Sequence, residues 1–189
     1  PSAYGVDRSQ GSNPIRQELD NLEHAGSLYG SIIYNKAPIM MRQLELALGK
    51  EAFKEGIQTY IKRYSNSNSD WNGLVSILDQ KTDLDLKQWS DVWVNSTGRP
   101  VFSEQITYDE NQNISQFNLM QEAEDGTTKI WPQAFEIDLV YADHIQKIAV
   151  VSNRKKIELP EAIGLKKPKT IIYNSNGFGY GAVSYTHLR

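Results

Sequence analysis

Apolar residues recur at helical spacing throughout the first half of this 189-residue chain. From Phe53 to Tyr64 they occupy positions i, i+4, i+7, i+8 and i+11, which form one stripe of an amphipathic helix. The stretch from Ile33 to Leu48 has similar spacing, and Gly49 follows it where a helix would end. Cap residues and further apolar positions predict three more helices, over residues 13–22, about 70–78 and 86–93.

The period of the apolar residues changes to two after Gly98-Arg99-Pro100. Within 135–139 they alternate with Glu136 and Asp138, as in a half-buried strand. Further strands are predicted around 102–108, 117–119, 148–150 and 171–173, with turn-forming clusters between several of them. The sequence therefore predicts an α+β fold: a helical segment over 1–97, followed by a small antiparallel β-sandwich over 98–182.

Composition and charge exclude several classes of function. The chain is 39% hydrophobic and 23% charged, which is ordinary for a globular protein. Its net charge is −3 and its Lys and Arg residues are scattered, so no basic stripe for a nucleic-acid partner is present. No apolar run approaches the roughly 20 residues that span a bilayer, so we expect no transmembrane segment. With no cysteine, disulfides and thiolate chemistry are excluded.

The last seven residues, 183–189, resemble a translated sequencing-adapter read-through. We expect this segment to be a non-native tail, with a genuine terminal strand as the alternative. The chain begins with Pro1 and shows no secretory signal. We therefore expect the native protein to be longer at both ends.

Histidine chemistry is sparse. The three histidines are His24, His144 and His187, and none lies in an HExxH motif. We expect His24 to face solvent on a helix and His144 to lie in a turn between strands. The sequence thus contains no metal-ligand set of its own.

Two other patterns have plain structural interpretations. The glycine-rich segment 177–181 matches part of a nucleotide-binding fingerprint, but no helix follows it, so a turn or bulge is expected. The acidic pairs Glu122/Glu124 and Glu136/Asp138 have the composition of glycosidase carboxylates, yet each lies on a segment where solvation explains it.

Tyr34 stands out because of the proline that follows it. Pro38 removes a hydrogen-bond donor from the helical pattern and crowds the carbonyl of Tyr34, so either the helix kinks or a new one starts near Pro38. Both arrangements place Tyr34 beside irregular backbone. A phenol there can donate a strong hydrogen bond to a developing oxyanion while staying neutral at pH 7. The alternative from chemistry alone is a packed core tyrosine.

The segment 31–45, with Tyr34-Asn35-Lys36-Ala37-Pro38 inside it, resembles the Tyr-x-Lys-Gly-Ala motif of M1 zinc aminopeptidases. Ala37-Pro38 departs from the Gly-Ala of many members. Other segments resemble family features in the same order: Asp7 with Ser12–Ile15, Leu48–Phe53, Tyr60–Tyr64, Asp70–Leu74, Trp89 with Trp93, Gly98–Val101 and Asn174 with Gly177–Gly181. The likeness covers about residues 5–182.

This resemblance implies the C-terminal part of a thermolysin-like catalytic domain, followed by the family's β-sandwich. In the family, the tyrosine that matches Tyr34 stabilises the tetrahedral intermediate, and the position of Tyr29 lines the substrate site in some members. The resemblance also implies a peptide substrate and a Zn²⁺ ion that activates water beside a glutamate base, with its ligands encoded before Pro1 and absent from this chain. Lys36 is interpreted as structural or solvated. The isolated chain is expected to be inactive, and the alternative function is a non-catalytic M1-like scaffold or protein-interaction module.

Overall fold

The computed structural model describes residues 2–7, 9, 12–18, 21, 23 and 30–184. The chain divides into two compact units, one of residues 11–97 and one that combines residues 1–10 with 98–189. Within the described residues, no helix is both long and apolar enough to cross a membrane.

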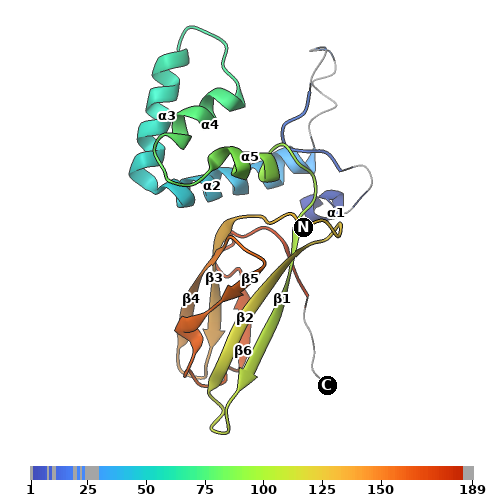
Figure 1. Ribbon diagram of the computed structural model, residues 1–189, viewed down its shortest axis with the longest axis vertical. Coiled ribbons are helices and arrows are strands. Elements are labelled where there is room, and N and C mark those ends of the chain that lie inside the picture. The colour runs from blue at the N-terminus through green and yellow to red at the C-terminus, as the bar shows by residue number, and fades with distance from the viewer. Residues whose placement is uncertain are drawn as a thin grey trace. The chain divides into compact units, whose positions relative to one another are not determined.

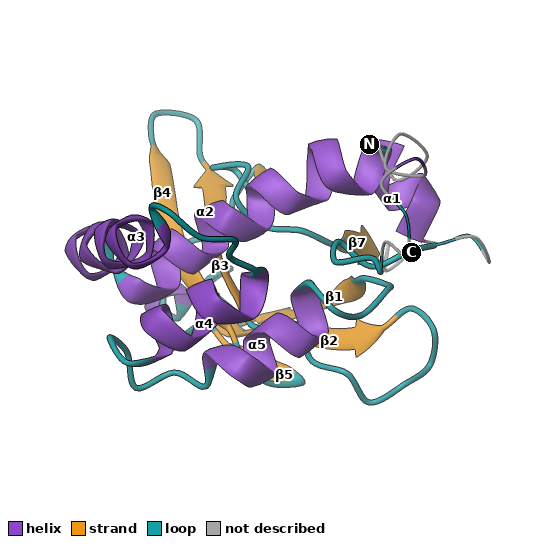
Figure 2. Ribbon diagram, turned by 90° about the horizontal axis from the view of Figure 1, so that it is seen from above, coloured by secondary structure: helices purple, strands orange, loops and turns teal. Residues whose placement is uncertain are grey.

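The first unit is helical. A short π-helix, η2, leads directly into α2, and α3, α4 and α5 follow along the chain. Their bounds are η2 Ile32–Lys36, α2 Ala37–Leu48, α3 Lys50–Tyr64, α4 Trp71–Asp79 and α5 Leu86–Trp93. Figure 2 shows α4 and α5 next to each other, and the Trp71 indole nitrogen links them by donating to the Ser90 hydroxyl at 2.6 Å.

Local sequence signals explain where these helices begin and end. Gly49 has φ +81°, a conformation that favours glycine, and it separates α2 from α3. The side chain of Asp70 caps α4 by accepting from the Gly73 N–H, and Asp85 caps α5 by accepting from the Gln88 N–H. The four helices predicted around 33–48, 53–64, 70–78 and 86–93 are confirmed.

The predicted buried stripe of α3 needs one correction. Ile61 is 61% exposed, whereas the small residue Gly56 is buried. At Gly56 the helix approaches α4 so closely that an added Cβ would overlap the side chain of Leu78, which is completely buried. Close approach at a glycine, rather than a full stripe of large side chains, joins α3 to α4.

The predicted helix over 13–22 is wrong for its described part, since residues 12–18 contain no helix. The Asn13 side chain donates to the Pro14 carbonyl instead of capping a helix. The Arg16 N–H donates to the carbonyl of Val94 at 2.9 Å, and its guanidinium donates to Asn72 at 3.0 Å. The backbone donor that an Asn13 cap would have bonded in such a helix is thus taken by a long-range bond to Val94.

The second unit is a β-sandwich whose two sheets face each other (Figure 1). One sheet has the order β5-β2-β1-β7 and the other β4-β3-β6. The strands are β1 Pro100–Tyr108, β2 Ile114–Ala123, β3 Gln133–Val140, β4 Ile145–Ser152, β5 Lys156–Glu158, β6 Thr170–Tyr173 and β7 Ala182–Ser184. This agrees with the predicted α+β class and antiparallel sandwich, with β7 as an exception because it pairs in parallel with β1.

The sandwich core comes from the alternation seen in the sequence. Inward residues of both sheets are buried together, and the rings of Phe102 on β1 and Phe135 on β3 meet edge to face at 5.6 Å between centroids. The buried set is Phe102, Ile114, Phe117, Leu119, Phe135, Ile137, Leu139, Ile148, Val150, Ile157, Leu159 and Ala162.

Two terminal elements complete this unit: a helix that was not predicted, and a strand that was expected only as the alternative to a non-native tail. Ser2–Asp7 form α1, which belongs to the same unit as the sandwich. Val183 and Ser184, the first two residues of the expected tail, pair with Phe102 and Ser103 of β1. Residues 185–189 lie outside the described residues.

Candidate active site

Tyr34 lies in the middle of the π-helix and points away from the buried side of the first unit. Its side chain is 66% exposed, whereas Ile32 and Lys36, two residues to either side, are 2% and 0% exposed. Residues two apart lie on opposite sides of a helix, so burial of Ile32 and Lys36 turns Tyr34 outward. The interpretation of Tyr34 as a packed core tyrosine is therefore wrong.

The hydrogen bonds of this turn change register at Tyr34. The Tyr34 N–H donates to the Gly30 carbonyl, four residues back, at 3.1 Å. The Ala37 N–H donates to the Ile32 carbonyl, five residues back. π-helical turns are rare and are found often at functional sites. The predicted irregularity before Pro38 thus takes the form of a π turn that runs into α2.

The other predicted site positions are less informative. Tyr29, His24 and His187 lie outside the described residues. His144 lies in the expected turn after β3, where its ring stacks on Tyr141 with 4.6 Å between ring centroids. In the part of the chain that the structure describes, no three histidine, aspartate or glutamate side chains come together to hold a metal ion. The described residues therefore do not fit a zinc site.

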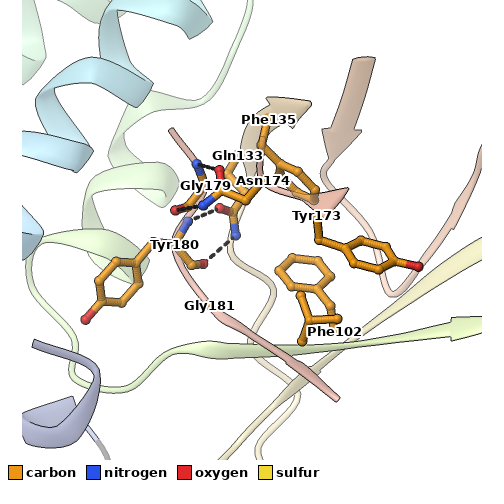
Figure 3. Close-up of a pocket in the computed structure, with 9 residues that line it drawn as sticks. Phe102, Gln133, Phe135, Tyr173, Asn174, Gly179, Tyr180 and Gly181 are labelled. Carbon is orange, nitrogen blue, oxygen red and sulfur yellow. Dashed lines mark hydrogen bonds between the residues drawn. The ribbon is translucent and has the colours of Figure 1, made fainter. Parts of the chain in front are cut away.

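The glycine-rich segment 177–181 is a packed turn (Figure 3). The Asn174 side chain accepts from the Gly179 N–H at 2.6 Å and donates to the Gly179 carbonyl at 2.9 Å. The Gln133 side chain bonds the Tyr180 backbone in the same two-way manner, at 2.7 and 3.0 Å. The adjoining cavity has a volume of about 20 Å³, enough for about one water molecule. The turn interpretation is confirmed, and the space is too small for a nucleotide.

A buried polar network connects α1, the start of β1 and this turn. The Tyr180 hydroxyl donates to Asp7 at 2.6 Å, and both side chains are buried. Arg99 is also buried and binds Glu124 through two hydrogen bonds of 2.6 and 3.1 Å. The hydrogen bond to Glu124 raises the pKa of Arg99, and the nearby Asp7 and Tyr180 act in the same direction. Sequence reasoning marked Asp7, Arg99 and Tyr180 in three separate segments but did not connect them.

The acidic pairs that resembled glycosidase carboxylates have structural partners. Glu122 pairs with Lys155 at 3.1 Å. Lys147 contacts both Glu136 and Asp138, at 3.1 and 3.5 Å. Solvation explains Glu122, but it is wrong for Asp138, which is buried, and Glu124 binds the buried Arg99.

The comparison with protein families gives a match for the helical half of the chain. A family model described as "Peptidase family M1 domain" matches residues 2–93, which include Asp7 and Tyr34. Two curated relatives match nearly the whole chain. Aminopeptidase N of Streptomyces lividans is 26% identical over 96% of this chain and 22% of its own length. Aminopeptidase 2, mitochondrial, of Saccharomyces cerevisiae is 25% identical over 99% of this chain and 19% of its own length.

The helical half of the chain therefore resembles peptidase family M1. M1 proteins are hydrolases that depend in general on zinc, and the named relatives are aminopeptidases. The chain spans about a fifth of the length of these two relatives. The crystal structure of Legionella pneumophila aminopeptidase A in complex with aspartic acid has the same fold, with a TM-score of 0.60 over 85% of this chain and 19% of that chain, at 15% identity.

Tyr34 lies inside the matched region. Among the described residues, no group of three potential metal ligands accompanies it.

Proposed function

We propose that this chain is part of an M1 aminopeptidase that removes N-terminal residues from peptides, in which Tyr34 stabilises the tetrahedral intermediate. The observation that carries the proposal is the exposed phenol of Tyr34 on a π turn inside the region that matches family M1. When water adds to the scissile carbonyl, its oxygen gains negative charge. The Tyr34 hydroxyl donates a hydrogen bond to that oxygen, which is worth more in the transition state than in the ground state.

Burial in the same turn supports this role. Ile32 and Lys36 are held in the interior, and their burial fixes the backbone that carries Tyr34. A donor fixed before the reaction begins needs no reorganisation when charge develops. Tyr34 thus supplies one hydrogen-bond donor to the reaction. In this proposal, the rest of the catalytic machinery lies outside the described residues.

The test is Tyr34→Phe in the longer protein that carries this sequence together with an HExxH segment. The expected result is a fall in kcat of on the order of 10²-fold or more, with KM nearly unchanged, because loss of one oxyanion donor has that scale. Tyr60→Phe is the matched control, since it removes a hydroxyl whose printed contact is a long one, 3.5 Å to the Asp70 carbonyl, and keeps the ring that packs on Tyr64. Wild-type kcat in the Tyr34 variant would overturn the assignment.

We propose that the 189-residue chain by itself binds no stoichiometric zinc and has no aminopeptidase activity. The chain is dialysed against Zn²⁺, metal is counted by mass spectrometry, and hydrolysis of aminoacyl substrates is measured in parallel. Well under one equivalent of zinc is expected. One tightly held equivalent accompanied by turnover would show that the chain contains a complete site.

The alternative is a non-catalytic M1-like scaffold or protein-interaction module. It is favoured by the lack of a metal-ligand cluster among the described residues. A scaffold, however, has no use for an exposed phenol at Tyr34, where phenylalanine would serve equally well. The longer protein separates the two, because a scaffold retains its fold and partners without hydrolysing peptides.

A further inference from the structure

Pro38 lies two residues after the end of the π-helix that carries Tyr34, and the two features are physically linked. Proline has no N–H to donate and its ring collides with the carbonyl four residues back, which here belongs to Tyr34. A π turn is wider than an α-helical turn, and its backbone N–H groups bond to the carbonyl five residues back instead of four. The Ala37 N–H, one residue before the proline, has already shifted to the Ile32 carbonyl. The wider turn thus admits a proline that a continuous α-helix would exclude.

The π turn also decides which way Tyr34 faces. The buried residues Ile32, Lys36, Met40 and Leu44 recur at every fourth position. In an α-helix, four residues turn by about 40° more than one full circle. Side chains spaced four apart therefore shift steadily around the helix axis. The π turn over Ile32–Lys36 contains more residues per circle, so the shift between Ile32 and Lys36 is smaller than in an α-helix. Ile32 and Lys36 stay on the buried side, and Tyr34 is held on the opposite, exposed side.

We propose that Pro38 is a positioning residue that imposes the π turn and thereby sets the direction of the Tyr34 phenol. This inference rests on the proposed function of Tyr34. Pro38 touches neither substrate nor reacting atoms; it acts through the backbone register of the turn. Its side chain is exposed, so replacing it does not open a cavity in the core.

The experiment is a double-mutant cycle in the longer protein, with Pro38→Ala, Tyr34→Phe and the combination. Pro38→Ala restores the missing N–H and is expected to lower kcat by on the order of 10- to 100-fold through displacement of the phenol, with KM nearly unchanged. In the Tyr34→Phe background the same change is expected to have no further effect, because the displaced hydroxyl is already absent. Pro160→Ala, a first-turn proline of a short 3₁₀-helix in the sandwich, is the matched control.

A structural measurement accompanies the kinetics. A crystal structure of the Pro38→Ala variant is expected to show the Ala37 N–H bonded to the Ile33 carbonyl, as in an α-helix, with the Tyr34 side chain rotated. Thermal unfolding shows whether the variant is folded, and Pro38→Ser replaces it in the cycle if it is not.

The outcomes distinguish the two proposals. If Tyr34→Phe retains full activity, the proposed function of Tyr34 is wrong whatever Pro38 does. If Tyr34→Phe loses activity but Pro38→Ala keeps wild-type kcat, only the positioning role is overturned. The positioning role also fails if the π turn persists without the proline, or if Pro38→Ala lowers kcat equally in both backgrounds.

Discussion

Replacing Tyr180 by phenylalanine removes one oxygen atom and leaves its buried ring in place. Tyr180 is 1% exposed, and its hydroxyl donates to Asp7, which is 7% exposed, at 2.6 Å. The two residues are 173 positions apart in sequence, so this bond attaches α1 to the sandwich turn. Because the ring still fills its space in Tyr180→Phe, the cost comes from the hydrogen bond and not from a cavity.

The magnitude follows from the nature of the acceptor. Hydrogen bonds to charged groups contribute about 1.5–3 kcal/mol, so the variant should lose roughly 2 kcal/mol of unfolding free energy. With a urea m-value of about 2 kcal/mol/M, the unfolding midpoint of the sandwich unit should fall by about 1 M. Tyr141→Phe is the matched control, since its hydroxyl donates to the Lys166 carbonyl at an exposed site and its loss should cost less.

Hydrogen exchange measured by mass spectrometry across a urea series follows the sandwich peptides separately from the helical unit. This separation matters because a two-unit chain need not unfold in one step. Asp7→Asn combined with Tyr180→Phe completes a cycle, and the coupling energy should exceed about 1 kcal/mol for residues in direct contact. A Tyr180→Phe midpoint within experimental error of wild type, or additive effects in the cycle, would refute the reasoning.

Two further predictions concern other parts of the molecule. Gly56→Ala should destabilise the helical unit by about 1–3 kcal/mol, because the added methyl overlaps the buried side chain of Leu78. Gly30→Ala is the control, because a methyl there meets no atom within 4 Å. Urea unfolding of both variants tests the prediction. Hydrogen bonding, chiefly from the Asn113 N–H, lowers the pKa of Asp109, so its stabilisation is present above the ordinary aspartate pKa of about 3.9 and is lost as pH falls through the lower, folded value. Thermal midpoints of the sandwich measured below about pH 4 should therefore fall less steeply in Asp109→Asn than in wild type; equal slopes would contradict the assignment.

The helices and strands that sequence predicted are those whose burial pattern is local. On α4, Leu74, Val75, Ile77 and Leu78 are all buried, and such spacing is visible without knowing what packs on it. On β3, the apolar residues Phe135, Ile137 and Leu139 are buried because their face meets the other sheet, although Asp138 between the last two is buried as well. Periodicity predicts an element when a single face of it is buried.

The features that sequence missed, misplaced or left open depend on distant partners. The helix predicted at 13–22 fails where Arg16 bonds to Val94. The three-residue strand β7 is too short to show a period and exists through its pairing with β1. The bond between Asp7 and Tyr180 joins the two ends of the chain. The pattern of a few neighbouring residues cannot show which distant residues they will contact.

The π turn lies between these cases and shows what a resemblance adds to chemistry. From the residues, Pro38 predicted an irregularity but left open a kink or a new helix, and Tyr34 could have been a core tyrosine. The resemblance to family M1 singled out Tyr34, while Ala37-Pro38 counted as a departure from the family motif. In the structure, the proline lies next to the one-residue register shift, and Tyr34, whose carbonyl it would crowd in an α-helix, is turned outward. A substitution that weakens a motif match can thus belong to the geometry that the motif serves, and the Pro38 cycle measures whether it does.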